Sequence, residues 1–337
     1  MIGTSRQALK TLFGNVDSNA EPQRIVSYLP LSHVAAQLVD IHGPMHMAST
    51  TYFAQPDALQ GSLVQTLSEV RPTQFLGVPR VWEKIEEKVR SYIFVLLLLM
   101  RNGLDASDWC CWLGSETTYR CMGKTSWTGR YGWRRYTLFK HNNINVGTIA
   151  KLNNKSLPWG WHVANKLVFE NVKKALGLDA CKLSFTAAAP IGKKTMEYFM
   201  SLDNPLYEVY GMSECSGPHT VNVPGACKVG TVGVALHGVE IKLADMDAKN
   251  NGEICMRGRH VFMGYLHNSD ATMGSIDEEG WLHSGDVGAL DTDGFLKITG
   301  RIKELIITAG GENVPPVCIE DIVKEELPAV SNVMVIG

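Results

Sequence analysis

Helical and strand patterns alternate at short intervals along this chain of 337 residues. Apolar residues recur at helical spacing over 58–70 and 80–90, and a strand is predicted between these helices at 74–78. The alternation resumes with a helix predicted over 163–176 and a strand over 183–186. Helices and strands that alternate at this interval favour doubly wound β/α units, so the predicted fold class is α/β.

Three parts are predicted along the chain. Residues 1–228 carry the α/β pattern and are predicted to form a doubly wound sandwich. Short β runs separated by glycines over 229–300 are typical of a β-rich subdomain. A basic turn flanked by glycine at Arg301 opens the segment 301–337, which we interpret as a partial C-terminal α+β lobe.

The window 92–161 interrupts the α/β pattern. Six of the eight tryptophans and eight Lys or Arg residues fall between Trp109 and Trp161, against one acidic residue, Glu116. A patch of this composition would suit RNA or lipid head groups. Neither helical nor alternating periodicity is visible, however, and binding patches lie on periodic scaffolds. We therefore favour an aberrant, poorly packed insertion.

Composition excludes several classes of protein. The 32 Lys and Arg against 34 Asp and Glu give a net charge of -2, whereas a nucleic-acid binder needs a basic excess. The eight cysteines form no C-x-x-C pair and have no nearby histidine at zinc spacing, so reduced thiols in a cytoplasmic chain are expected. The most apolar run, Ile93 to Met100, has eight residues, and a transmembrane helix needs about 20.

One motif lies where a predicted strand ends, in Tyr207–Cys215 (YEVYGMSEC). Open α/β sheets bind ligands at the carboxyl ends of their strands. Glu214 is a hard oxygen ligand suited to Mg²⁺, Ser213 can contact a phosphate, and Tyr210 can stack on a base. The alternative interpretation is a surface turn after a buried strand.

Two further motifs follow in the β-rich region and after it. In Gly280–Gly288, Asp286 follows a glycine, and a carboxylate there suits two ribose hydroxyls. An Asx turn that closes a hairpin explains this motif equally well. In Gly300–Pro316, Arg301 is a candidate for binding phosphate or ribose, and the glycines at 310–311 make a pliable loop that admits a narrow ligand.

Together, these motifs resemble the adenylate-forming superfamily of acyl-CoA synthetases, and the chain is most similar to its bubblegum-type long-chain fatty acid branch. The resemblance covers about 21–91 and 162–337 and stops across 92–161. The segments that carry it are SYLPLSHVAAQ at 27–37, FLGVPRVWEK at 75–84, YGMSECSGPH at 210–219 and IITAGGENVPP at 306–316.

The resemblance implies a long-chain fatty acid–CoA ligase that works in two steps. The fatty carboxylate attacks the α-phosphate of Mg-ATP to give acyl-adenylate and pyrophosphate. The thiol of CoA then displaces AMP to give the thioester. ATP, Mg²⁺ and CoA are thus the implied cofactor and co-substrates, and the fatty acid is the partner, with no nucleic acid and no transmembrane span.

The resemblance also implies a role for each matching residue. Those at the adenine, phosphate and Mg²⁺ positions are Tyr210, Gly211, Met212, Ser213 and Glu214, of which Glu214 would hold the metal as a catalytic residue. The others are Asp286 and Arg301 on the ribose, Thr186 and Ala187 in the adenine-side loop, Lys303 as the catalytic hinge of the C-terminal lobe, and Gly310 and Gly311 along the pantetheine channel. The family commonly has glycine where Ala187 stands.

Two roles are open for His33. The resemblance would place it near the acyl pocket. Ser32 is, however, predicted to cap a helix over 33–41, and His33 would then be a structural residue at the start of that helix.

Two parts of the family pattern are missing. Residues 1–20 contain no Ser/Thr/Gly-rich phosphate loop, and the chain stops at Gly337, before the adenylation lysine. The loop and the lysine donate hydrogen bonds to the phosphate in the transition state. Losing one such donor raises the activation barrier by about 3 kcal/mol, so we expect this chain to be inactive as a ligase on its own.

Two alternative functions are kept. One is a non-catalytic truncated product or mispredicted gene model that retains partial nucleotide or acyl binding. The other is a different acyl-adenylate chemistry, such as that of luciferases, although the GGENVPP sequence at 310–316 favours the fatty acyl branch. We expect a cytoplasmic protein, and peripheral attachment to the endoplasmic reticulum or another membrane is left open.

Overall fold

A computed structural model describes residues 22–101, 161–248, 250–304, 306–307, 313–314, 316–327, 330 and 333–336. The chain divides into two compact units, one over Val16–Tyr207 and one over Glu208–Gly337. The division falls within strand β5 (Leu206–Met212), so the sandwich predicted over 1–228 includes residues of both units. The boundaries predicted at 228 and 300 stay predictions.

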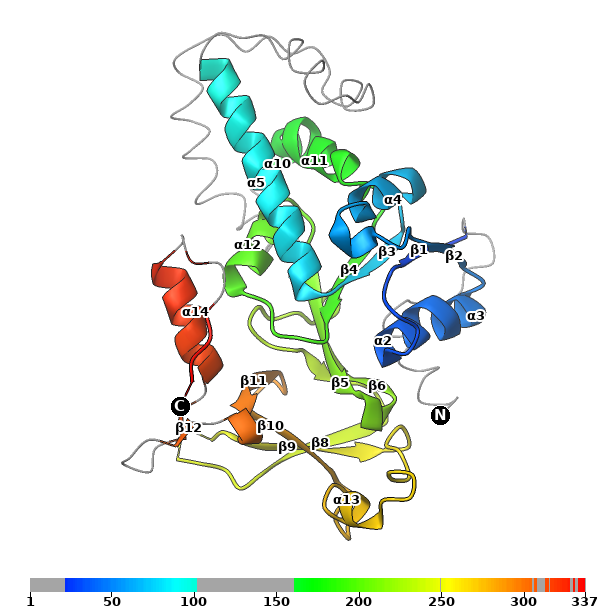
Figure 1. Cartoon of the computed structure of the whole chain (residues 1–337), viewed down its shortest axis with the longest axis vertical. Helices are drawn as coiled ribbons and strands as arrows, with labels where there is room; N and C mark the ends of the chain where they lie inside the picture. Colours follow the sequence, from blue (N-terminus) through cyan, green and yellow to red (C-terminus); the bar gives the residue numbers. More distant parts are fainter. Residues whose placement is uncertain are drawn as a thin grey trace. The chain divides into compact units, whose positions relative to one another are not determined.

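The first unit alternates helices with short parallel strands, as the sequence predicts (Figure 1). Strand β1 pairs with β2, and β3 pairs with β4, both in parallel. The elements, with η for 3-10 or π turns, are β1 (Arg24–Ser27), α2 (Val34–Ala36), η1 (Gln37–His42), α3 (Gly43–Met47), β2 (Thr50–Phe53), η2 (Ala58–Gln60), α4 (Leu63–Val70), β3 (Gln74–Gly77), α5 (Pro79–Arg101), α10 (Trp161–Ala164), η4 (Asn165–Phe169), α11 (Glu170–Ala175), β4 (Leu183–Ala187) and α12 (Lys193–Ser201).

Trp82 lies in the hydrophobic core of the first unit. Its ring packs edge-on against Phe75 and Phe199, with centroids 5.3 and 5.0 Å away. The buried indole N–H donates to the carbonyl oxygens of Gly77 and Phe185, at 2.9 and 3.1 Å. A Cβ on Gly77 would lie 2.6 Å from the indole nitrogen, so only glycine lets β3 approach this ring. The large apolar surface is thus buried without leaving its polar atom unpaired.

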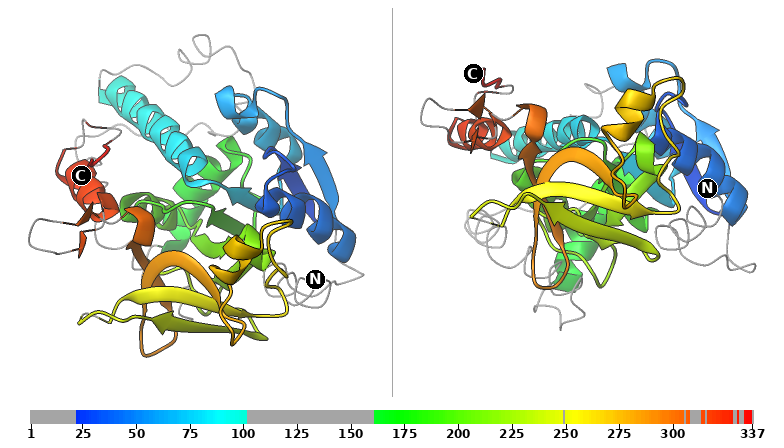
Figure 2. Two further views of the ribbon diagram at one scale, coloured as in Figure 1. Left: turned by 60° about the horizontal axis from the view of Figure 1, so that its bottom comes forward. Right: turned by 90° about the horizontal axis from the view of Figure 1, so that it is seen from below.

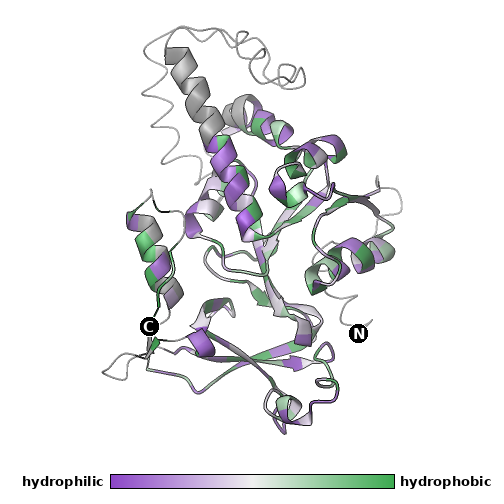
Figure 3. Ribbon diagram, in the orientation of Figure 1, coloured by the Kyte–Doolittle hydropathy of each residue, from purple (hydrophilic) through white to green (hydrophobic). Residues whose placement is uncertain are grey.

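Helix α4 is amphipathic, as its spacing predicts. Leu63, Thr66 and Leu67 are buried, while hydrophilic side chains occupy other positions along the same helix (Figure 3). Gly177, just after α11, has φ +70°, and a Cβ there would lie 2.2 Å from the carbonyl oxygen of Leu67. Glycine therefore permits both the turn and the close approach to the backbone of α4.

Helix α5 is longer than predicted. It runs from Pro79 to Arg101, whereas the sequence predicts a helix over 80–90. Residues 96–101 are Leu, Met and Arg, which have high helix propensity and favour the extension. The rest of the window up to residue 160 lies outside the described residues, so its poor packing stays a prediction. Its last residue, Trp161, is buried and packs against Phe169. Among the described residues, no helix is long and apolar enough to cross a membrane.

The helix predicted over 33–41 begins with a different cap. His33 has extended backbone angles (φ −81°, ψ 130°), and its Nδ1 accepts a hydrogen bond from the backbone N–H of Ala35 at 3.1 Å. The predicted cap at Ser32 is therefore wrong by one residue, because the N-cap is the residue that keeps extended geometry while its side chain faces the free N–H groups. This contact favours the structural role for His33, and its acyl-pocket role stays a prediction.

Antiparallel strands dominate the second unit (Figures 1 and 2). Strands β5, β6 and β7 pair in sequence, and a separate sheet has the order β11-β10-β9-β8, which matches the predicted β-rich region. The elements after β5 are η5 (Ser213–Cys215), β6 (Gly217–Val221), β7 (Val234–Ala235), β8 (Val239–Ala244), β9 (Gly252–Gly258), α13 (Ser269–Met273), β10 (Leu282–Leu290), β11 (Leu296–Arg301), η6 (Ile302–Glu304), β12 (Ile306–Ile307), β13 (Asn313–Val314) and α14 (Pro316–Glu326).

Candidate functional site

Three of the predicted nucleotide residues meet in the second unit. The hydroxyl of Tyr210 donates to Oδ2 of Asp286 at 2.7 Å. Nε of Arg301 donates to Oδ1 of the same carboxylate, also at 2.7 Å. Tyr210 and Asp286 are 76 positions apart in the sequence, and Asp286 and Arg301 are 15 apart. The structure therefore brings these three residues together, while their roles toward a nucleotide stay predictions.

Strand pairing explains why this cluster forms. Asp286 of β10 stands opposite Arg301 of β11 in antiparallel register, so the two side chains are near neighbours. Tyr210 comes from β5, where the register with β6 shifts between Tyr210 and Gly211. A Cβ on Gly211 would lie 1.8 Å from the carbonyl oxygen of Gly217, so only glycine fits between these strands. Gly211 thus has a structural role independent of any ligand.

The electrostatics of the cluster keep the Tyr210 hydroxyl protonated. Burial and the neighbouring Asp286 charge raise the pKa of Tyr210, and the hydrogen bond to Asp286 raises the pKa of Arg301. The Asp286 side chain is 10% exposed and that of Arg301 is 59% exposed. A carboxylate offers about four acceptor positions, and these two hydrogen bonds use one on each oxygen. About one further acceptor position therefore remains on each oxygen.

The Tyr210 ring is part of the hydrophobic core of this unit. It packs in one buried cluster with residues of β9 and β10, among them Ile254 and Leu282. The whole residue is 9% exposed. Its described contacts are thus core packing and the hydrogen bond to Asp286, and stacking on adenine stays a prediction.

Ser213 and Glu214 lie in η5, directly after β5. Oε1 of Glu214 accepts a hydrogen bond from the hydroxyl of Tyr265 at 2.8 Å, and its backbone carbonyl accepts one from the N–H of Phe262, also at 2.8 Å. Glu214 is half-buried and Ser213 is exposed. Mg²⁺ commonly binds through one or two carboxylates together with substrate phosphates, so this carboxylate fits the metal.

The remaining predicted residues belong to other parts of the chain. Thr186 and Ala187 end strand β4 in the first unit, Lys303 is exposed in η6, and the glycines at 310–311 lie outside the described residues. Oγ1 of Thr186 is buried and has no hydrogen-bond partner among the described residues. Ala188 has φ 76°, the left-handed region that favours glycine. The adenine-side, hinge and pantetheine roles stay predictions.

Two supporting contacts come from residues that no sequence motif indicates. Tyr265 holds Glu214 from 51 positions away. Oε1 of Glu253 accepts a hydrogen bond from the backbone N–H of Gly285 at 2.9 Å, next to Asp286. Both contacts depend on chain segments that are distant in sequence, so local spacing carries no signal for them.

Comparison with known proteins agrees with the resemblance seen in the sequence. Residues 3–266 match the family model described as AMP-binding enzyme. Long-chain-fatty-acid–CoA ligase ACSBG2 of Xenopus laevis is 50% identical over 93% of this chain and 38% of its own length. Human ACSBG1, also named a long-chain-fatty-acid–CoA ligase, is 43% identical over 95% of this chain and 40% of its own length. The chain thus spans about two fifths of the length of these relatives.

Solved structures give the fold. o-Succinylbenzoate CoA synthetase (MenE) of Bacillus subtilis, in complex with its acyl-adenylate intermediate, has a TM-score of 0.61 at 18% identity, over 98% of this chain and 50% of its own. The ATP-bound RpMatB–BxBclM chimera B3 has a TM-score of 0.60 at 19% identity, over 96% of this chain and 48% of its own. The predicted α/β fold of adenylate-forming enzymes is confirmed. With more than half of its residues matched by the family model, the chain belongs to the AMP-binding enzyme family.

Proposed function

We propose that this chain supplies the nucleotide-binding part of a ligase that activates long-chain fatty acids with ATP and transfers them to CoA. The observation that carries the proposal is the hydrogen-bonded cluster of Tyr210, Asp286 and Arg301. It lies in a chain that is 43–50% identical to several long-chain-fatty-acid–CoA ligases. Three residues that the family pattern assigns to the nucleotide are thus joined by hydrogen bonds, which supports the proposal.

In this proposal each residue acts on one part of ATP. Asp286 accepts hydrogen bonds from the ribose hydroxyls on its remaining acceptor positions, while Arg301 holds its carboxylate in place. Glu214, oriented by Tyr265, would hold Mg²⁺. When bound, this ion neutralises negative charge on the phosphates.

The chemistry that follows is acyl transfer through a mixed anhydride. The fatty carboxylate oxygen bonds to the α-phosphorus as the bond to pyrophosphate breaks, and the CoA thiol then displaces AMP with loss of its proton. The fatty acid and CoA are proposed from the relatives named above. Cytoplasmic location and peripheral membrane attachment are proposed from the expected reduced thiols and from the apolar substrate.

The ribose role is tested by measuring ATP affinity calorimetrically in Asp286→Ala. Losing hydrogen bonds to a charged acceptor should weaken binding by about 1.5–3 kcal/mol, which is about 10- to 150-fold. The matched control is Asp293→Ala, in the exposed turn that follows β10. Circular dichroism of each variant confirms that it is folded. Unchanged affinity in Asp286→Ala would count against the ribose role.

The ligase activity is tested in a chimera of the Xenopus laevis relative that carries residues 208–304 of this chain in place of its matching segment. Pyrophosphate exchange should depend on a long-chain fatty acid and stay within about tenfold of the parent, because a tenfold change is only about 1.4 kcal/mol of barrier. A folded chimera that binds ATP but shows no exchange would contradict the proposed reaction.

A further inference from the structure

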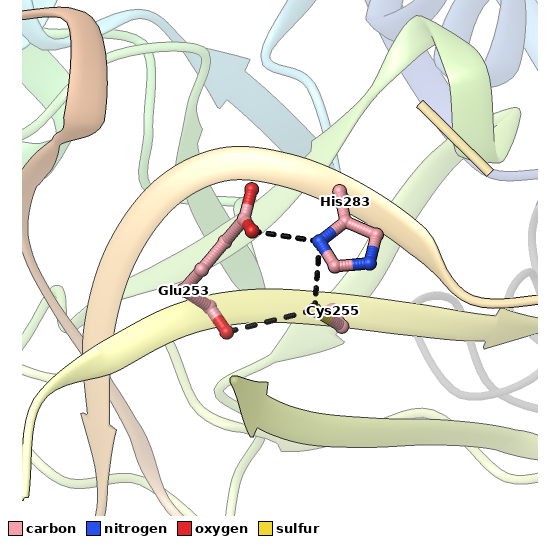
Figure 4. Close-up of side chains that lie close together, drawn as sticks. All are labelled: Glu253, Cys255 and His283. Atoms are coloured by element: carbon pink, nitrogen blue, oxygen red, sulfur yellow. Dashed lines mark hydrogen bonds and ion pairs between the residues drawn. The ribbon is translucent and has the colours of Figure 1, made fainter. Parts of the chain in front are cut away.

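We propose that Glu253, Cys255 and His283 form a zinc-binding site in the second unit, separate from the nucleotide cluster (Figure 4). Each offers one ligand atom of a kind that zinc accepts: a carboxylate oxygen, a thiolate sulfur and an imidazole nitrogen. These three atoms lie within 4.8 Å of one another.

The strand geometry places the three side chains together. Glu253 and Cys255 are two positions apart on β9, so their side chains point to the same face of the sheet. His283 of β10 stands directly opposite Cys255 in the antiparallel register. Figure 4 shows β10 arching over β9 with the imidazole directed at both neighbours. The cluster therefore follows from the pairing of β9 with β10.

The distances are close to those of a tetrahedral site. Sγ of Cys255 lies 3.6 Å from Nδ1 of His283, and Oε2 of Glu253 lies 2.7 Å from the same nitrogen. Ligand atoms at 2.0–2.3 Å from a tetrahedral zinc are about 3.3–3.8 Å apart. The sulfur and nitrogen are already at this separation, whereas the carboxylate oxygen is closer to the nitrogen than this and has to move away from it to bind the same ion.

Two outer contacts hold the ligands in the orientation that a metal requires. Nε2 of His283 lies 3.5 Å from Oδ2 of Asp277, which places a carboxylate behind the imidazole, as is usual for zinc-binding histidines. Oε1 of Glu253 accepts the hydrogen bond from the N–H of Gly285, which leaves Oε2 directed at His283. Lys242 lies 3.5 Å from the same Asp277 oxygen and balances its charge. A dication bound to one thiolate and one carboxylate would then be neutral overall.

The donor set and its exposure favour zinc over the cations that prefer oxygen. Sulfur and imidazole nitrogen are poor ligands for Mg²⁺ and Ca²⁺ but good ligands for Zn²⁺. Cys255 is fully buried, whereas the side chain of His283 is 31% exposed and that of Glu253 is 15% exposed. A metal could thus enter past the imidazole, and three protein ligands leave a fourth position for water.

Sequence spacing does not reveal this site. No histidine lies near Cys255 at zinc spacing in the sequence, because His283 is 28 positions later and reaches it through strand pairing. Short-range ligand motifs describe sites built within one loop, and this cluster is built across two strands.

The test is metal binding by the purified 337-residue chain after chelator treatment and desalting. Zn²⁺ is titrated against a chromophoric chelator, and Co²⁺ binding is followed by absorption. We expect submicromolar Zn²⁺ binding at one site and a thiolate-to-cobalt charge-transfer band. Cys255→Ser should abolish that band and weaken zinc binding at least tenfold, and Asp277→Asn should weaken it by about 10- to 100-fold.

Matched controls are Cys227→Ser and His237→Gln, two residues of the same unit outside the cluster. Both should keep the zinc affinity and the cobalt band. The proposal is overturned if the wild-type chain binds no zinc in the micromolar range or gives no thiolate band, results that need no variant to fold. It is also overturned if Cys255→Ser, shown to be folded by circular dichroism, binds zinc as tightly as the wild-type chain.

Discussion

Removing the Asp286 carboxylate should destabilise the second unit through the Tyr210 hydroxyl. That hydroxyl belongs to a side chain packed in the hydrophobic cluster with Ile254 and Leu282, and it donates to Oδ2 of Asp286 at 2.7 Å. Asp286→Ala removes the carboxylate acceptor and leaves the buried Tyr210 hydroxyl without this hydrogen bond. The substitution also removes one of the two carboxylates that pair with Arg301, the other being that of Glu304 at 3.9 Å.

The size of the effect follows from the exposure of each partner. A buried hydroxyl that loses its hydrogen bond costs about 1–3 kcal/mol. The Arg301 side chain is 59% exposed, so its ion pair adds at most about 1 kcal/mol. We expect Asp286→Ala to lower the free energy of unfolding by about 1–4 kcal/mol. Tyr210→Phe should lower it by about 1–2 kcal/mol, because Arg301 still holds the carboxylate.

The double variant distinguishes a formed hydrogen bond from general disturbance. With both groups removed, no unpaired hydroxyl remains, so Tyr210→Phe should cost almost nothing in the Asp286→Ala background. Urea denaturation of the four proteins, followed by circular dichroism, should give a coupling of at least about 1 kcal/mol. Tyr265→Phe, at a partly exposed hydroxyl bonded to Glu214, is the control and should add independently to Asp286→Ala. The reasoning would be refuted if the loss in unfolding free energy of the Tyr210→Phe/Asp286→Ala double variant equals the sum of the two single losses within about 0.5 kcal/mol.

Two further predictions concern single side chains. Burial raises the pKa of Glu208 from 4.5 to about 7, so the neutral carboxyl contributes stability at low pH that is lost as pH rises through this window. Glu208→Gln should therefore gain stability relative to the wild-type chain between pH 4.5 and 7, and parallel stability curves would contradict the shift. His33→Ala should cost about 1 kcal/mol through the lost N-cap, whereas His33→Asn should cost little. Equal thermal-denaturation losses in both His33 variants would rule out the capping role.

The pairing of Asp286 with Arg301 is the part of the site that sequence predicts best. The intervening segment contains an Asp-Gly turn at 293–294 between two β runs, which is a strong hairpin signal. Counting outward from that turn brings the two residues nearly opposite each other. Their clustering is therefore encoded locally, and the structure places them in register.

Other features could not be predicted from local patterns. The Glu214–Tyr265 contact and the Glu253–Cys255–His283 cluster depend on how distant segments pair. β9 and β10 are separated by a long connection that contains α13, so no turn fixes their register in advance. The extension of α5 beyond residue 90 could not be predicted for another reason. The apolar run there lacks the periodicity by which helices are identified.

The proposed metal site and the cluster of Tyr210, Asp286 and Arg301 share one irregular segment of β10. Between the pairs His283–Cys255 and Val287–Glu253 the register with β9 shifts, which makes a bulge. At its centre Gly285 has φ +72°, and Glu253 accepts the hydrogen bond from its N–H. Bulges redirect side chains next to functional sites, and this one presents Asp286 to Arg301.

Glu253 therefore has two functions that substitution should separate. Glu253→Gln keeps an oxygen that can accept from Gly285 but loses the charged ligand, so zinc affinity should fall at least tenfold while ATP affinity stays within about threefold, or about 0.7 kcal/mol. Glu253→Ala removes both functions and should weaken ATP as well, because the bulge that presents Asp286 loses its support. Calorimetric titration with ATP, in the absence of zinc, measures only the support that Glu253 gives to the bulge. If Glu253→Ala and Glu253→Gln bind ATP equally well, the bulge does not depend on this hydrogen bond.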